Sequence, residues 1–352
     1  MHYGVIGDAH HGFKAYDSNK RTEETIWTFV QAIEILYTLG VKEFFLPGDL
    51  LDDTVITNWV EKKLVNIFSK YQDATFYVLG GNHDCTKTYA SVSALDVLAE
   101  LSNLEVINNF EPIKFTSIQG LRVVAIPHMK SQREFKDAVM AITGEHDIAM
   151  LHAMVCSNLD LGPNDLNIDE VMLYHLEKHC NRVFVGHQHN PVIASDKTVL
   201  IGSTMEFGFG ELGPKYVYHV TDKLEIIQIP QPRSLERIDI NWSGIGDLLD
   251  RLSALCISCI YKVVISNVPS SEYSACLSAI DSVCSGFSGD LIYDVIKLGH
   301  EDVEISTIDA SFDLKSEFTL FCEANAYNYE ELIGDLEDAI SALMAEEEDL
   351  SL

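Results

Sequence analysis

Long apolar runs and positive charge are both scarce in this sequence. No stretch of about 18 apolar residues occurs, so no membrane span is expected. The opening MHYGVIGDAHHG lacks a basic segment followed by an apolar one, which argues against a secretory signal and favours a cytoplasmic protein. The 24 Lys and Arg residues are outnumbered by 54 Asp and Glu residues, so the formal net charge is −30.

The excess of acidic side chains is greatest after residue 230. Such a charge argues against non-specific adhesion to nucleic acid or to an anionic membrane. A polyanionic substrate would therefore have to be held by bound cations and a local basic patch. The 8 cysteines are scattered, and Cys256 and Cys259 form a C-x-x-C without a second pair. Reduced core thiols are therefore favoured over a disulfide framework or a zinc cluster.

Strand-like and helix-like segments alternate through the first two thirds of the chain. The predicted strands cover residues 2–7, 41–46, 75–79, 121–126, 148–151, 182–185, 199–201, 216–220 and 223–229. The predicted helices cover 22–39, 59–71, 91–101, 133–142 and 169–179. Repeated strand–helix–strand units predict an α/β domain with helices outside the sheet layers.

A domain boundary is predicted near Pro230, where two prolines interrupt the pattern. The expected domains are 1–230, a small α+β domain at 231–320, and a helical segment at 321–352. Within that segment, residues 329–344 carry apolar side chains at helical spacing and an acidic tail follows. The apolar stripe either packs on its own domain or docks on a partner.

Five short segments place Asp, Asn or His beside a glycine or directly after a predicted strand. They are Gly7-Asp8-Ala9-His10, Gly48-Asp49-Leu50-Leu51-Asp52, Gly81-Asn82-His83-Asp84, Leu151-His152 and Gly186-His187-Gln188-His189. Side chains at strand ends converge on one edge of a sheet, where α/β folds bind their ligands. Each segment taken alone has an ordinary explanation. His152 alone, for example, is more typical of a histidine packed in the core. Their conjunction in this order favours one shared site.

The residue types in these segments indicate a site for divalent metal. Imidazole nitrogen mixed with carboxylate oxygen, without thiolate, suits manganese, iron or zinc. Asp49 stands in the middle of the set, the natural place for a carboxylate shared by two metals. His187 and His189 would face opposite sides of an extended strand, so both serve the site only if the backbone turns between them. His175 and His179 have a spacing that can bind zinc but lack a third ligand, which favours a solvated helix face.

In order and rough spacing, these segments resemble the signature of the calcineurin-like metallophosphoesterases. That signature reads D-x-H, G-D-x-x-D, G-N-H-D, a single His and G-H-x-H, and the resemblance covers about residues 1–205. GDAHHG, GDLLDD and LHAMV are most similar to the SbcD-type nuclease subunit of double-strand-break repair complexes and its phage recombination counterparts. The resemblance implies an α/β metallophosphoesterase sandwich, a capping domain, and a helical segment that docks on an SbcC-type coiled-coil ABC ATPase. It also implies DNA as substrate, a homodimer, and the host cytoplasm as location if the chain is phage-encoded.

The resemblance also implies two divalent metal ions, preferably Mn²⁺, with Mg²⁺, Fe²⁺ or Zn²⁺ as alternatives. By resemblance, the first metal is held by Asp8, His10, Asp49 and His189. The second is held by Asp49, Asn82, His152 and His187. His83 resembles the proton donor of the family, and Asp84 would orient it. Archaeal-type members have a histidine where Asp52 stands, which leaves the balance of exonuclease and endonuclease activity open.

Three functions are compatible with these features. The leading hypothesis is a metal-dependent DNA exo- and endonuclease that acts in recombination and double-strand-break processing. The alternative is a metallophosphoesterase acting on nucleotides or another small phosphodiester or phosphomonoester, favoured by the acidity that repels a long polyanion. A metal-free scaffold that binds a partner is disfavoured by the intact ligand set. The basic side chains near the motifs, candidates for phosphate contact, are Lys14, Lys20, Arg21, Lys87, Lys130 and Arg133.

Overall fold

The computed structural model of the chain describes residues 2–15, 20–85, 92–108, 112–155, 166–256, 258–286 and 290–298. Met1–Lys297 form one compact unit. The predicted helix at 329–344 and its acidic tail lie outside the described residues. Among the helices that are described, none is both long and apolar enough to cross a membrane.

The first sheet has six strands in the order β14-β13-β1-β2-β3-β4. Their bounds are β1 Tyr3–Ile6, β2 Glu43–Leu46, β3 Thr75–Leu79, β4 Leu104–Ile107, β13 Lys215–Val220 and β14 Leu224–Ile229. β1 to β4 pair in parallel, and β13 pairs antiparallel with both β1 and β14. Every side chain of β1 and β2 is buried, as expected of parallel strands that are covered on both faces.

The second sheet also has six strands, in the order β11-β12-β10-β7-β6-β5. Their bounds are β5 Ile113–Thr116, β6 Arg122–Ile126, β7 His146–His152, β10 Cys180–Gly186, β11 Val192–Ile193 and β12 Thr198–Leu200. The four central strands are parallel, and β5 and β11 run antiparallel at the two edges. Beyond β7, the short strands β8 (Met154–Val155) and β9 (Asn167–Ile168) pair with each other.

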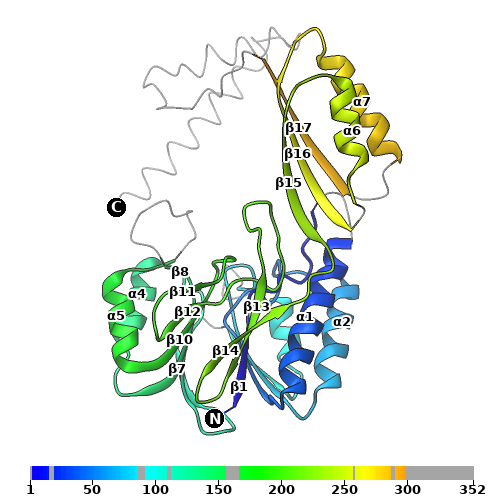
Figure 1. The fold of residues 1–352 in the computed structure, drawn as a ribbon. Coiled ribbons are helices and arrows are strands. Elements are labelled where there is room, and N and C mark those ends of the chain that lie inside the picture. The colour runs from blue at the N-terminus through cyan, green and yellow to red at the C-terminus, as the bar shows by residue number, and fades with distance from the viewer. Residues whose placement is uncertain are drawn as a thin grey trace, which may run out of the picture. The chain divides into compact units, whose positions relative to one another are not determined.

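Helices cover the outer face of each sheet, and the inner faces pack together (Figure 1). The first sheet carries α1 (Lys20–Thr38), α2 (Asn58–Lys70) and α3 (Ala94–Leu98), and the second carries α4 (Gln132–Met140) and α5 (Glu170–His179). Between the sheets, buried side chains such as Val5 and Phe45 share one core with Met150 and Phe184. The predicted layered α/β sandwich is confirmed.

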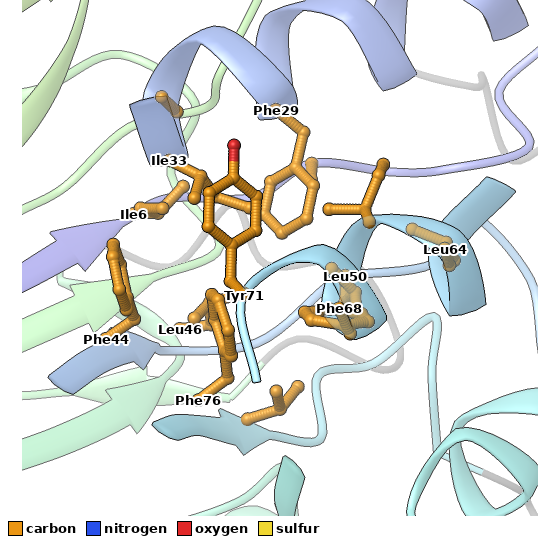
Figure 2. Close-up of a cluster of buried hydrophobic side chains, with 14 of the residues drawn as sticks. Ile6, Phe29, Ile33, Phe44, Leu46, Leu50, Leu64, Phe68, Tyr71 and Phe76 are labelled. Carbon is orange, nitrogen blue, oxygen red and sulfur yellow. The ribbon is translucent and has the colours of Figure 1, made fainter. Parts of the chain in front are cut away.

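Aromatic packing under α1 and α2 holds the first sheet in place (Figure 2). The rings of Phe44 and Phe76, from neighbouring strands, stack with centroids 4.7 Å apart. Phe68 of α2 meets Phe76 edge-on at 5.0 Å, and Phe29 of α1 meets Phe68 at 6.0 Å. Burying a side chain of this size contributes about 1.5–3 kcal/mol. This core fixes the carboxyl ends of β1, β2 and β3, where three of the five motif segments begin.

The chain continues from β14 into a small α+β structure. Its strands β15 (Ser234–Asn241), β16 (Cys259–Val268) and β17 (Asp290–Lys297) form one parallel sheet. α6 (Ile245–Ser253) and α7 (Tyr273–Gly286) lie side by side on one face of this sheet (Figure 1). The predicted boundary at 230 falls directly after β14, while the predicted limit at 320 lies outside the described residues, so the domain limits stay predictions.

Several elements differ from the sequence expectation. α3 is shorter than the predicted helix at 91–101, because Ser93 caps its first turn and the helix ends at Leu98. β4, β5, β11, β15 and α6 were not predicted. β5 alternates apolar and polar residues, but it is only four residues long and mostly exposed, so the alternation is too short to identify a strand. α6 starts after Gly244 without a side-chain cap, which removes the usual signal for a helix start.

Candidate metal centre

The first motif follows β1 at the carboxyl edge of the first sheet. Asp8 is fully buried, and its Oδ2 accepts a hydrogen bond from the backbone N–H of His187 at 2.7 Å. His10 is also buried and has φ of 44°, a conformation that residues other than glycine rarely adopt. The backbone N–H of His10 donates to the carbonyl of Asp49 at 3.0 Å, which joins the first motif to the second.

Asp49, which follows β2, lies at the centre of the cluster. Its φ is 47°, so it too stands in the left-handed region, and such outliers gather at functional sites. The carboxylate Oδ1 accepts from the N–H of His83 at 3.0 Å. The other oxygen, Oδ2, lies 3.1 Å from His152 Nε2 and 3.5 Å from His10 Nε2. One carboxylate thus reaches histidines from two different motifs.

Asn82 and His83 follow β3. The Asn82 side-chain oxygen lies 2.9 Å from His152 Nε2 and 3.1 Å from His187 Nδ1. His83 is exposed, and its ring lies 4.8 Å from that of His10. The Nδ1–H of His83 donates to the carbonyl of Asp52 at 2.8 Å, which leaves Nε2 as the ring nitrogen that can carry a proton to or from a substrate.

His152 ends β7, in the second sheet, and is buried. Its Nδ1–H donates to the carbonyl of Pro47 at 2.9 Å. This hydrogen bond fixes the orientation of the ring and turns Nε2 toward the oxygens of Asn82 and Asp49. His152 was predicted to belong to the site. Its contacts bring the end of a strand of the second sheet to the residues that follow β2 and β3.

His187 and His189 follow β10. The backbone turn that their joint use requires is present, because His187 has φ of 88°. His189 Nε2 lies 3.1 Å from His10 Nε2 and 3.9 Å from Asp8 Oδ2, whereas His187 faces Asn82. The two histidines therefore join two different ligand groups.

The structure brings all seven predicted ligands together, in overlapping groups. Ligand atoms lie within 4.8 Å of one another in three sets, which are Asp8-His10-His189, His10-Asp49-His83 and Asp49-His152-His187. Asp8 Oδ1 is buried and has no hydrogen-bond partner among the described residues. A buried carboxylate oxygen without a donor is costly unless a cation satisfies it. The donor set and this oxygen both fit a pair of divalent cations.

The buried charges in the cluster depend on one another. Burial raises the pKa of Asp8. Burial alone would also raise the pKa of Asp49, but the neighbouring His152 holds it well below its usual range. Burial opposes the charge of His152, yet the Asp49 carboxylate raises the pKa of His152 to about 9. Without a bound cation, protonated His152 thus balances the negative charge of the Asp49 carboxylate.

We expect metal affinity to rise with pH up to about 9. A metal ligand must be neutral imidazole, and the pKa of His152 is raised to about 9, so below that pH a proton has to leave before a cation binds. Each pH unit below 9 should therefore lower the apparent affinity of the His152 position by up to about tenfold. Calorimetry with Mn²⁺ in buffers of different ionisation enthalpy measures this proton release. An affinity that stays constant between pH 6 and pH 8, without proton release, would contradict the expectation.

The resemblance implied that Asp84 orients His83, but the carboxylate of Asp84 contacts other groups. Its carboxylate accepts from the backbone N–H groups of Leu50 at 3.1 Å, Leu51 at 2.7 Å and Gly81 at 3.2 Å. Burial and the neighbouring Asp49 raise the pKa of Asp84 to about 7. Asp84 thus ties the second motif to the third, while Nδ1 of His83 is held by a backbone carbonyl instead.

Sequence reasoning missed a group of residues beyond the motifs. Glu211 Oε1 accepts from His189 Nδ1 at 2.8 Å, and the buried Lys215 donates its Nζ hydrogen to the His189 carbonyl at 2.8 Å. Phe207 packs against the rings of both His10 and His189, with centroids 4.9 and 5.3 Å away. These residues lie on or beside the connection from β12 to β13, which carries no motif. An acid and a lysine four residues apart in an otherwise apolar segment is the only signal that points to them.

Gly48 is required by its surroundings, and its replacement by alanine should disturb His152. Gly48 has φ of 109°, and an added Cβ would lie 2.1 Å from His152 Nδ1. Gly120 offers a matched control, since its φ is 86° and nothing lies within 4 Å of an added Cβ. Both substitutions should lower the free energy of unfolding by about 1–2 kcal/mol for the left-handed backbone. Only Gly48→Ala should also weaken cation binding, and wild-type binding of two cations by Gly48→Ala would contradict the assignment.

Two histidines outside the site differ from expectation. His175 and His179 were predicted to form a solvated helix face. Instead, the rings hydrogen-bond to the carbonyls of Ile142 at 3.0 Å and Gly144 at 2.8 Å. They hold the turn between α4 and β7, because backbone carbonyls outside helices and sheets need other donors.

Two ligand groups that share Asp49, at the carboxyl ends of strands from two facing sheets, define a candidate two-metal centre of an α/β sandwich hydrolase. The family model of the calcineurin-like phosphoesterases matches residues 1–191, and the chain belongs to this family. Members of the family hydrolyse phosphoesters. The family assignment implies a hydrolase that acts on phosphoesters, and the Asp and His groups of this chain fit the metal ions of such an enzyme.

A similarity to a DNA repair protein covers a similar length of the chain. The chain is 24% identical over 190 residues to the "DNA double-strand break repair protein Mre11" of Sulfurisphaera tokodaii. The match covers 52% of this chain and 48% of that protein, so it spans about half the length of the relative.

Proposed function

We propose that this protein is a two-metal DNA exo- and endonuclease that acts in double-strand-break processing and recombination. The observation that carries the proposal is the cluster of seven ligands, which form two groups with Asp49 in common. The exposed His83 lies beside Asp49. Similarity to a DNA double-strand break repair protein supports DNA as the substrate. Manganese is the metal that we expect to support activity best, as the resemblance implies, and ligands that combine carboxylate, amide and imidazole without thiolate suit it as they suit iron or zinc.

The chain's own residues account for binding and proton transfer. When bound, two divalent cations neutralise phosphoryl charge and lower the pKa of a water molecule. Asp8, His10 and His189 would hold one cation, and Asn82, His152 and His187 the other, with Asp49 shared. His83, whose Nδ1–H is fixed by the Asp52 carbonyl, is placed to give the proton on Nε2 to the leaving oxygen.

Of the basic side chains near the motifs that the structure describes, one is withdrawn from phosphate contact. Arg21 is buried and pairs with Glu24 at 2.6 Å, which removes it from the set of candidates. The exposed candidates are Lys14, Lys20, Lys130 and Arg133, while Lys87 lies outside the described residues. The acidity of the chain therefore makes bound cations the main attraction for a polyanionic substrate.

An assay with three substrates tests the proposal. Purified full-length protein should hydrolyse linear duplex DNA in Mn²⁺, and EDTA should abolish the reaction. Single-stranded DNA and a small diester such as bis-p-nitrophenyl phosphate are run in parallel. Hydrolysis of the small diester alone would overturn the DNA nuclease and support a phosphoesterase for nucleotides or other small substrates, the function that the net charge of −30 favours.

The partner assignments extend the same proposal. We expect the C-terminal segment 321–352 to dock on an SbcC-type coiled-coil ABC ATPase, and two copies of the chain to associate through the phosphoesterase domain. Exposed apolar side chains on and beside α2 and α3 support the second expectation, since Val55, Trp59 and Val97 are 77%, 43% and 49% exposed. Retention of the ATPase by a chain lacking residues 329–352 would contradict the first.

A further inference from the structure

The two histidines of one ligand group are each supported by an acidic side chain. His189 Nδ1 donates to Glu211 Oε1 at 2.8 Å, and the side chains of the two residues are 22% and 23% exposed. His10 Nδ1 lies 3.3 Å from Asp52 Oδ1. In both rings the other nitrogen, Nε2, points into the cluster, where these two atoms are 3.1 Å apart. A carboxylate behind a ligating imidazole fixes its orientation and raises its basicity.

The contact that supports His152, in the other ligand group, is of a different kind. His152 donates its Nδ1–H to the neutral carbonyl of Pro47. Asn82, which faces His152 and His187, adds an uncharged amide oxygen. The group formed by Asp8, His10 and His189 therefore has three carboxylates of its own, from Asp8, Asp52 and Glu211. In the group formed by Asn82, His152 and His187, the Nδ1–H of His152 faces a neutral carbonyl where those of His10 and His189 face carboxylates.

The segment that carries Glu211 is itself held in place. Glu211 Oε2 accepts from the backbone N–H of Phe207 at 3.3 Å. Glu206, in the same segment, accepts from the N–H groups of Gly213 at 2.7 Å and Leu235 at 2.8 Å. Lys215 lies 3.9 Å from the Glu211 carboxylate. A fixed backbone can keep Glu211 behind His189 without help from a cation.

We propose that Glu211 is a positioning residue for the cation at Asp8, His10 and His189, and that with Asp52 it makes this position the tighter of the two. The inference rests on the two-cation centre of the proposed function and adds an order of filling to it. A first cation would enter the Asp8 position, and a second would complete the centre beside Asn82. Glu211 need not touch the substrate, because it acts through His189.

The test compares Glu211→Gln with a matched variant elsewhere in the chain. His219 Nδ1 donates to Glu225 Oε2 at 2.8 Å, the same distance as in the pair under test, and His219 pairs with Gly4 at the opposite end of β1 from Asp8. Glutamine keeps an oxygen that can accept from His189 and Phe207 but removes the charge. In calorimetric titration with Mn²⁺, the wild type should show a tight and a weaker site. Glu211→Gln should weaken the tight site about 10–100-fold, whereas Glu225→Gln should bind as the wild type does.

Anomalous diffraction with one equivalent of Mn²⁺ locates the first cation directly. We expect the peak between Asp8, His10 and His189 in the wild type, and a shift of occupancy toward Asn82 and His152 in Glu211→Gln. A first peak beside Asn82 and His152 in the wild type, or unchanged binding by Glu211→Gln, would overturn the inference. If Glu211→Gln does not fold, Asp52→Asn replaces it and should weaken the same site.

The outcomes separate this inference from the proposed function. Two-site binding with the predicted order, in a protein that cleaves no DNA, would refute the nuclease and keep the role of Glu211. DNA cleavage by a wild type whose titration is unchanged in Glu211→Gln and in Asp52→Asn would refute the role of Glu211 alone.

Discussion

Asp49→Asn is expected to empty both cation positions and to abolish hydrolysis. The Asp49 carboxylate lies within reach of histidines from both groups, with Oδ2 3.1 Å from His152 and 3.5 Å from His10. Loss of a supporting residue alone costs about 10–100-fold in metal affinity, so loss of a shared ligand should cost at least that at each position. Equilibrium dialysis followed by elemental analysis measures the number of bound Mn²⁺ ions per chain.

A neighbouring acid supplies the control for Asp49→Asn. Asp53 is exposed, and its carboxylate accepts from the hydroxyl of Thr54 at 3.0 Å. Asp53→Asn removes the same charge four residues away and should keep two bound cations. If Asp49→Asn still holds two ions with wild-type affinity, the shared-ligand assignment is wrong.

His83→Gln should separate cation binding from catalysis. His83 is exposed, and its Nδ1 is bound by the carbonyl of Asp52, so its removal should leave the number of bound cations unchanged. Loss of a general acid typically lowers the rate about 10²–10⁴-fold. We expect a loss of this size in kcat for DNA, measured by release of labelled nucleotides.

The leaving group decides what His83 does. A p-nitrophenolate leaves without protonation, so hydrolysis of thymidine p-nitrophenyl phosphate should fall much less in His83→Gln than hydrolysis of DNA does. Equal loss on both substrates would point to a role for His83 in binding or in holding a cation, which its place in the group with His10 and Asp49 permits.

The strand-end ligands could be predicted because two simple rules apply to them. Apolar runs such as residues 75–79 identify buried strands, and polar residues after parallel strands meet at one edge. His187 and His189 could even be assigned a backbone turn between them, since one extended strand cannot turn both inward. The observed φ of 88° at His187 is that turn.

Residues that act through contacts made only in three dimensions could not be predicted. Glu211 reaches His189 across 22 residues from a connection without a motif, and Asp84 finds its partners in the loop after β2. Arg21 was a candidate for phosphate contact because lysine and arginine are usually exposed. Its ion pair with Glu24 is local, at i, i+3 in α1, but the guanidinium also donates to the carbonyl of Glu206, 185 residues away, and that contact leaves no trace in local sequence.

The central claim is that two cations are bound side by side and share Asp49. Anomalous diffraction from crystals saturated with Mn²⁺ tests it most directly. Two peaks about 3.5–4 Å apart are expected, one beside Asp8, His10 and His189 and one beside Asn82, His152 and His187, with Asp49 between them. A single peak, or a second peak that lies away from Asp49, would contradict the account.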